Sequence, residues 1–261
     1  MKVALMLTGL ARKVEEGYKH YWKYIIDNHD VDLYLHCWQD EEYEKVEEVY
    51  PKYKYLYIQK PFKFTKYREG IESPNDDKSR PLKDYDVWGN FRTFPMFYSW
   101  EETYRALRVS RHKYDCVIRS RYDLGTDIDI DLNKLDLSKI NISNHHWGGS
   151  PITDDNLCIL NQDNAEKLFS DIFTEYIEHS KKIGYIEFAE KNFMNILKRK
   201  NVWGKENGIG SFGYAAAMEK YKFNFPKKNK SKFSKKKNQN IKKKKKHKTK
   251  QTKKKKKDIE I

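Results

Sequence analysis

Two arginines and an aspartate occupy alternate positions in Lys113–Gly125, which reads K-Y-D-C-V-I-R-S-R-Y-D-L-G. The apolar run Cys116–Ile118 precedes them and predicts a buried β-strand. Alternate side chains of a strand share a face, so Arg119, Arg121 and Asp123 would line one side of its carboxyl end. Guanidinium groups bind diphosphates through forked hydrogen bonds, and a carboxylate can hold a divalent cation. The pattern indicates a nucleotide or sugar-nucleotide site, with a structural Arg–Asp ion pair as the alternative.

A second candidate ligand-binding feature follows the first apolar run of the chain. Val3–Leu7 predicts a buried strand, and T-G-L-A-R (Thr8–Arg12) comes directly after it. Gly9 permits a tight turn, Thr8 offers a hydroxyl, and Arg12 can reach an anion from the first turn of the next helix. This strand–turn–helix order predicts a phosphate-binding turn. It lacks the spacing of a G-x-G-x-x-G or Walker loop, so an ordinary βα turn is the alternative.

The elements that would position these residues alternate between strand and helix. Helical periodicity predicts a helix over Val14–Asn28, and Glu41–Glu48 is a second, charged helix. Apolar runs predict strands over Val31–Trp38 and Tyr53–Gln59. The resulting β-α-β-α-β order predicts an α/β fold with a mostly parallel sheet flanked by helices. Ligands of such sheets bind beyond the carboxyl ends of the strands.

The rest of the chain continues this pattern less regularly. A long loop over Lys60–Asp86 precedes a helix over Val87–Arg111, in which Asn90 and Ser99 are polar exceptions among apolar residues. The remaining predicted elements are strands over Lys139–Ser143, Asn156–Leu160 and Asn201–Trp203, a polar loop over Asn144–Ser150, and helices over Asn161–Phe173 and Glu187–Leu197.

The positive charge of the chain is concentrated at its C-terminal end. The 261 residues carry a formal net charge of +15. Pro226–Ile261 holds 19 of the 53 basic residues and 2 of the 38 acidic ones, so residues 1–225 carry 34 basic and 36 acidic side chains. We therefore expect one globular domain over residues 1–225 and a disordered Lys-rich tail over residues 226–261. Such a tail attracts anionic surfaces or nucleic acid without selectivity.

Cysteine usage and hydropathy restrict the compartment. Cys37, Cys116 and Cys158 lie in apolar runs without paired spacing, which predicts reduced core residues. No apolar segment has the length of a signal peptide's core or of a transmembrane segment. These features predict a cytoplasmic protein.

Several of these motifs, in this order and spacing, resemble a known family. They are T-G-L-A-R (Thr8–Arg12), D-L-Y-L-H-C-W (Asp32–Trp38), N-F-R-T-F-P-M-F-Y-S-W (Asn90–Trp100), Y-D-C-V-I-R-S-R-Y-D-L (Tyr114–Leu124), D-N-L-C-I-L (Asp155–Leu160) and an acidic helix start at Glu187. Over roughly the first two hundred residues the chain resembles GT-A-type glycosyltransferases. These include enzymes of capsular or lipopolysaccharide synthesis and counterparts in large DNA viruses.

The resemblance implies a GT-A-like, Rossmann-like fold that moves a sugar from a nucleotide-sugar donor, such as a UDP- or GDP-sugar, to a glycan, protein or other hydroxyl acceptor. It implies that Thr8, Gly9 and Arg12 face the nucleotide, with Asn90 and Ser99 alongside. A viral member would act in the host cytoplasm or the virion. The alternative is a non-catalytic protein that binds nucleotide sugars, or that binds anions or nucleic acid through its Lys-rich tail.

The resemblance also assigns the metal and the base. Arg119–Asp123 takes the place of the family's Asp-x-Asp metal motif, with Asp123 as its last carboxylate and Arg121 at the first. A divalent cation, Mn or Mg, is implied at Asp123, although a guanidinium can supply part of that charge. Asp155 and Glu187 are the implied candidates for acceptor binding or for the general base of an inverting transfer. A retaining transfer needs no such base.

Overall fold

The computed structural model describes residues 1–39, 42–71, 93–126, 131–147, 150–187, 189–202 and 223–224. Contacts divide the chain into two units, Met1–Phe225 and Pro226–Ile261, and all described residues belong to the first. Asn90, most of the predicted loop over Lys60–Asp86, and the Lys-rich tail lie outside the described residues.

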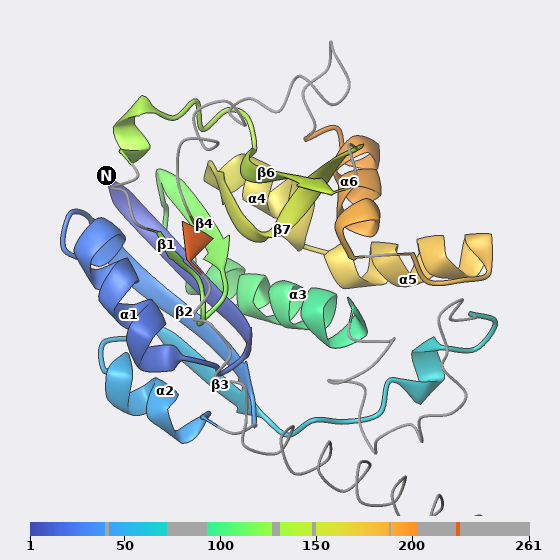
Figure 1. Ribbon diagram of the computed structural model, residues 1–261, viewed down its shortest axis with the longest axis horizontal. Coiled ribbons are helices and arrows are strands. Elements are labelled where there is room, and N and C mark those ends of the chain that lie inside the picture. The colour runs from blue at the N-terminus through green and yellow to red at the C-terminus, as the bar shows by residue number, and fades with distance from the viewer. Residues whose placement is uncertain are drawn as a thin grey trace, which may run out of the picture. The chain divides into compact units, whose positions relative to one another are not determined.

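A six-stranded sheet in the order β3-β2-β1-β4-β7-β6 runs through the first unit (Figure 1). Its strands are β1 (Lys2–Leu10), β2 (Asp30–Trp38), β3 (Tyr55–Gln59), β4 (Cys116–Ser120), β6 (Asn141–Trp147) and β7 (Ser150–Leu160). β1 pairs in parallel with β2 and β4, and β3 pairs in parallel with β2. β7 is antiparallel to both β4 and β6. The prediction of a mostly parallel α/β sheet flanked by helices is confirmed.

Both faces of the sheet are covered, which explains why β1 is apolar at consecutive positions. Val3, Leu5 and Leu7 contribute to one hydrophobic core and Ala4 and Met6 to the other, and all five are fully buried. Full burial of a Val, Leu or Met side chain contributes about 1.5–3 kcal/mol.

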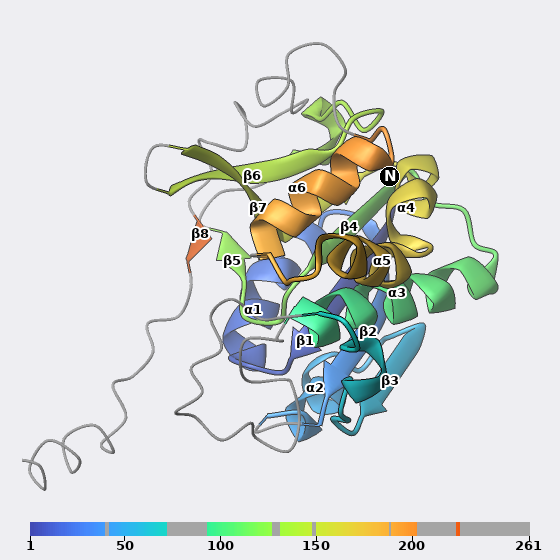
Figure 2. The same ribbon diagram turned by 90° about the vertical axis from the view of Figure 1, so that its right-hand side faces the viewer.

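Helices complete the two cores (Figures 1 and 2). The first core includes side chains of α1 (Val14–Tyr21), its π-helical continuation Trp22–Ile26, and α2 (Glu44–Val49). The second includes side chains of α3 (Thr93–Ser110), α4 (Gln162–Phe169), α5 (Ile172–Ile183) and α6 (Ala189–Arg199). The short strands β5 (Gly125–Thr126) and β8 (Phe223–Asn224) pair antiparallel as a separate sheet.

The chain reverses its direction across the sheet between β1 and β4. From β1 it proceeds outward through β2 to β3, and after α3 it returns to β4 on the opposite side of β1. At such a switch point a crevice opens beyond the carboxyl ends of the two strands, and ligands of open α/β sheets bind there. A ligand site is therefore expected at the end of β1 and the residues after β4.

Two predicted helices have different boundaries in the structure. The helix predicted over Val14–Asn28 changes from α-helix to π-helix at Trp22 and ends at Ile26. The helix predicted over Asn161–Phe173 is divided into α4 and α5. The division is stabilised by Glu101 of α3, whose carboxylate accepts hydrogen bonds from the backbone N–H groups that begin α5. Since this capping group comes from another helix, local periodicity could not reveal the break.

Two predictions of the second half are wrong. The polar loop predicted over Asn144–Ser150 belongs largely to the β6–β7 hairpin, where Trp147 is in register with Ser150. Backbone pairing, which does not depend on apolar side chains, extends both strands through this polar segment. The strand predicted over Asn201–Trp203 is instead the turn that ends α6. Its Asn201 has a φ of 53°, and Trp203 lies outside the described residues.

The three cysteines are buried free thiols, as predicted. Burial raises the pKa of Cys116 to about 12, so this thiol stays protonated at neutral pH. Every helix in the described ranges is too short or too polar to cross a membrane.

Candidate functional site

The carboxyl end of β1 remains a strand beyond the apolar run. Gly9 and Leu10 pair with Cys37 and Trp38 of β2, so the turn predicted over Thr8–Arg12 is wrong for its first three residues. Gly9 has a φ of 107°, which disfavours any side chain there, and a Cβ atom at this position would meet no atom within 4 Å. The backbone at the end of β1 is therefore open to an approaching group.

The predicted face of Arg119, Arg121 and Asp123 does not form, because β4 ends at Ser120. Only Arg119 lies on the strand, and the other two residues lie in the turn that follows. Helix α1 holds this turn: the Tyr21 hydroxyl donates to the Arg121 carbonyl at 2.6 Å and bonds the Ser120 hydroxyl at 2.7 Å. These bonds draw the chain out of the sheet before alternation can continue.

A glycine permits this close approach of α1 to the turn. A Cβ atom on Gly17 would lie 1.8 Å from the Tyr122 carbonyl oxygen. A contact that short is impossible, so no other residue fits without a backbone shift. A glycine inside a helical pattern often signals a close backbone approach, but the sequence does not say to which segment.

Arg119 is a buried residue with only 2% of its surface exposed. Its guanidinium carbon lies 3.5 Å from the centroid of the Trp100 ring, its Nε donates to the Thr8 hydroxyl at 3.3 Å, and its Nη1 donates to the Asp155 carbonyl. Burial lowers the pKa of Arg119 to about 9, against the opposing charge of Asp155, so the group is still charged at neutral pH. The side chain thereby connects α3, β1, β4 and β7.

Arg121 follows β4 directly, and its side chain is 35% exposed. Its Nε and Nη2 atoms donate to the two carboxylate oxygens of Asp123, each at 2.8 Å, and its Nη1 donates to Asn156 at 2.9 Å. Burial lowers the pKa of this guanidinium, but the charges of Asp123 and Asp155 outweigh that effect and raise it. The structure thus contains the forked Arg–Asp pair that was the alternative interpretation, and the pair lies at the switch point where a ligand would bind.

Asp155 belongs to the same cluster. It lies on β7, and its charge favours the protonated forms of both Arg119 and Arg121. Two guanidinium groups and two carboxylates therefore lie together around the carboxyl end of β4, with Arg119 buried on the strand and Arg121 and Asp123 in the turn after it. This arrangement is nearly neutral, can bind an anion through arginine, and offers carboxylates that can accept a proton.

Glu187, the other predicted acidic residue, lies in a different cluster just before α6. Its side chain is 7% exposed, and its carboxylate contacts Lys191 at 2.5 Å, Asn195 at 2.9 Å and His179 at 3.5 Å. No contact in the described ranges joins it to the arginines at the strand ends.

The remaining predicted donor-binding residues are Ser99, Arg12 and Asn90. Ser99 is fully buried in α3, and its hydroxyl donates to the Met96 carbonyl within the same helix. Arg12 is half-buried just before α1, where Lys13 adopts a φ of 51°. Asn90 lies outside the described residues.

The side chains around Asp123 do not form a binding site for the divalent cation that the resemblance implies there. Both oxygens of this carboxylate accept hydrogen bonds from Arg121. Within the described part of the chain, no group of three or more His, Cys, Asp or Glu side chains could hold a metal ion. The chemistry proposed below therefore uses only the protein's own side chains.

Sequence reasoning missed four residues that build this site: Gly17, Tyr21, Trp100 and Asn156. Tyr21 and Trp100 lie in predicted helices, and helical spacing does not reveal that each contacts the end of β4. Asn156 begins a predicted strand, and the sequence does not reveal that its amide oxygen accepts a hydrogen bond from Arg121.

A scan against protein-family models found no match to this chain, and a search of curated proteins also found none. The function proposed for the site therefore rests on its geometry.

Proposed function

We propose that the chain is a GT-A-type glycosyltransferase that moves a sugar from a nucleotide-sugar donor to a hydroxyl acceptor. The observation that carries the proposal is the position of Arg121 and Gly9 at the switch point of the sheet. The Arg121 guanidinium is partly exposed, and a Cβ atom at Gly9 would meet no atom within 4 Å. Sites at this position of α/β folds bind phosphate-bearing ligands, and arginine binds phosphate in a bidentate manner.

In the proposed complex, the donor's diphosphate lies beside Arg121, near the end of β1. Transfer breaks the bond between the anomeric carbon and the diphosphate oxygen, and negative charge develops on the leaving group. A guanidinium that is already held in place by Asp123 and Asn156 stabilises that charge without reorganising. Arg121 would therefore contribute more to the transition state than to donor binding.

Asp155 is the better candidate of the two acidic residues for the general base of an inverting transfer. Against the effect of burial, the charge of Asp155 raises the pKa of both Arg119 and Arg121. Glu187 instead pairs with Lys191 and accepts a hydrogen bond from Asn195, in a different cluster. In this role the carboxylate takes the proton of the acceptor hydroxyl as its oxygen attacks the anomeric carbon. Arg119 acts as a positioning residue, because it holds the Asp155 backbone against Thr8 and Trp100.

The test is nucleotide release. The full-length protein is incubated with UDP-, GDP- and CMP-sugars and a mixture of hydroxyl acceptors, and the freed nucleotide is measured. We expect release from one donor class, a loss of about 100-fold or more in Asp155→Asn, and a similar loss in Arg121→Gln. Unchanged turnover in both variants would overturn the assignment.

The alternative, in which the protein acts through its Lys-rich tail, predicts a different result. No donor would be turned over, and any nucleotide binding would be independent of sugar and base and would weaken steeply with salt.

A further inference from the structure

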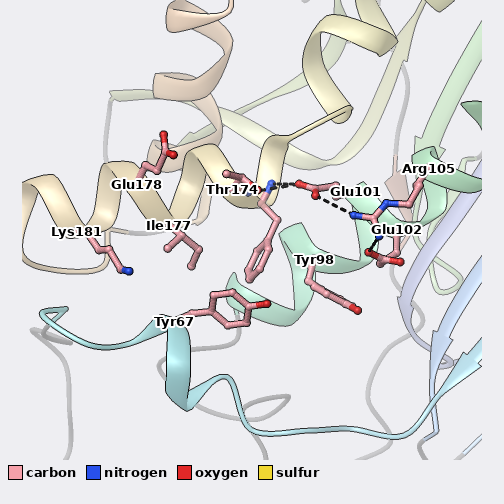
Figure 3. Close-up of a pocket in the computed structure, with 10 residues that line it drawn as sticks. Tyr67, Tyr98, Glu101, Glu102, Arg105, Thr174, Ile177, Glu178 and Lys181 are labelled. Atoms are coloured by element: carbon pink, nitrogen blue, oxygen red, sulfur yellow. Dashed lines mark hydrogen bonds and ion pairs between the residues drawn. The ribbon is translucent and has the colours of Figure 1, made fainter.

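A pocket of about 500 Å³ opens between α3, α5 and the 3-10 turn Thr65–Tyr67 (Figure 3). Ten residues line it: Tyr67, Tyr98, Glu101, Glu102, Arg105, Phe173, Thr174, Ile177, Glu178 and Lys181. The pocket contains none of the residues at the ends of β1 and β4. Its volume lies in the range of small-molecule sites, about 300–1,000 Å³.

Three aromatic rings form a preorganised apolar wall of the pocket. Phe173 is 5% exposed, and its ring meets Tyr67 edge-to-face at 5.0 Å and Tyr98 edge-to-face at 5.4 Å. The two tyrosines are half-buried, so each still presents ring surface to the hollow. Tyr98 is further fixed by Gln59, which donates to its hydroxyl at 3.4 Å.

The polar part of the lining is almost balanced in charge. Arg105 lies 2.9 Å from Glu102 and 3.5 Å from Glu101. On α5, exposed Glu178 and Lys181 are three residues apart, and in Figure 3 the Lys181 amine extends below the helix, on the side where Tyr67 lies. Three carboxylates and two cations thus line one small pocket, which gives little selection for a strongly charged ligand.

We propose that this pocket binds a neutral carbohydrate, as a short segment of a glycan chain. A pyranose ring has an apolar face that packs on aromatic side chains, and hydroxyls that both donate and accept hydrogen bonds. The pocket offers both kinds of partner, since Glu102 and Glu178 accept while Lys181 and the tyrosine hydroxyls donate. A phosphate would meet three carboxylates, and a cation would meet Arg105 and Lys181.

The pocket is separate from the proposed transfer site. Tyr98 lines the pocket, whereas Trp100 contacts Arg119. Tyr98 and Trp100 are two positions apart in α3, so they project from nearly opposite sides of the helix. A glycan in the pocket would therefore be held on the other side of α3, away from Arg121. The inference goes beyond the proposed function and does not depend on it.

Calorimetric titration of the full-length protein tests this proposal. The probes are maltotriose, cellotriose, chitotriose and mannotriose, with tetramethylammonium and citrate as charged comparators. We expect at least one trisaccharide to bind with a Kd of about 1 mM or lower, and neither charged probe to bind the pocket as tightly. Since the Lys-rich tail also attracts citrate, binding of a charged probe is assigned to the pocket only if Tyr67→Ala weakens it. If no trisaccharide binds at about 10 mM, or if a charged probe binds the pocket more tightly, the proposal is overturned.

Variants locate the binding and separate it from donor binding. We expect Tyr67→Ala and Lys181→Ala each to weaken trisaccharide binding by about tenfold, because the first removes a ring of the aromatic wall and the second removes a hydrogen-bond donor. Tyr185→Ala, at a tyrosine that is 40% exposed and outside the pocket, is the matched control and should change nothing. Trisaccharide binding that neither Tyr67→Ala nor Lys181→Ala weakens would contradict the proposal. Nucleotide release is measured on the same variants. A failure of sugar transfer can then be distinguished from a failure of trisaccharide binding.

Discussion

The guanidinium carbon of Arg119 lies 3.5 Å from the centroid of the Trp100 ring, and both side chains are buried inside the protein. The sequence places Arg119 and Arg121 two positions apart and suggests one shared role. The structure separates them, because the first connects four elements of the core whereas the second is partly exposed where a ligand would bind. The predictions below test this separation and the packing that produces it.

Arg119 should tolerate an apolar replacement better than a conservative one. Arg119→Met avoids burying a charge and keeps contact with Trp100, so we expect a loss of unfolding free energy of about 2 kcal/mol or less. Arg119→Lys keeps the charge without the planar group that bonds Thr8 and Asp155 together, and should lose about 3 kcal/mol or more. Urea unfolding of both variants measures the difference. A lysine variant more stable than the methionine variant would contradict the structural role.

Gly17→Ala should disturb the turn after β4. The new Cβ atom would lie 1.8 Å from the Tyr122 carbonyl oxygen, so the backbone must move, and we expect a loss of about 2–4 kcal/mol of unfolding free energy. Gly184→Ala is the matched control, because Gly184 has a φ of 79° but open space around its Cβ position. It should cost about 1–2 kcal/mol. Equal losses in the two variants would mean that α1 does not pack this closely.

Arg121 and Asp123 should have separable effects on stability and on donor binding. Arg121→Gln leaves the Asp123 carboxylate without its forked partner and should lose about 1 kcal/mol, since the arginine is partly exposed and screened. Adding Asp123→Asn should restore most of this stability, whereas donor binding should stay weakened by about tenfold or more in both variants. Recovery of donor binding in the double variant would show that the pair is only structural. Arg108→Gln, at an exposed arginine of α3, is the control.

His36 should make the fold sensitive to acid. It is fully buried on β2, its Nε2 is 2.9 Å from Gln59, and burial lowers its pKa from 6.5 to about 4. Between these two values the unfolded chain binds the proton and the folded chain does not, so stability falls as the pH drops below about 6.5. We expect His36 alone to account for a loss of about 2 kcal/mol between pH 8 and pH 5.

Unfolding at both pH values, in the wild-type protein and in His36→Gln, isolates this contribution. The variant should lose about 2 kcal/mol less than the wild type over this interval. Identical pH dependence in the two proteins would show that His36 is not held neutral by burial.

The parallel half of the fold could be predicted from the sequence because its strands are covered on both faces. Val3–Leu7 and Cys116–Ile118 are continuous apolar runs, and such runs mark buried parallel strands. The strands predicted over Lys139–Ser143 and Asn156–Leu160 overlap β6 and β7. Their extension through the polar segment between them was missed, because backbone pairing and not apolar sequence continues the strands there.

Part of the predicted residue set lies together in the structure, although not in the predicted geometry. The sequence identified Arg119, Arg121, Asp123 and Asp155, which the structure brings together. It could not show that β4 stops at Ser120, because the hydroxyl that holds the following turn belongs to Tyr21, far away in the chain. Contacts between distant segments leave no periodic signal in either one.

The most direct test of the central claim is the thermal stabilisation of the full-length protein by UDP-, GDP- and CMP-sugars, measured at low and high salt with and without manganese. The account predicts that one nucleotide sugar raises the melting temperature selectively, that the rise persists at high salt, and that Arg121→Gln reduces it. At a donor concentration of 100 times Kd the stabilisation should reach about 2.7 kcal/mol. If no nucleotide sugar stabilises the protein, or if Arg121→Gln responds as the wild type does, the proposed donor site is contradicted.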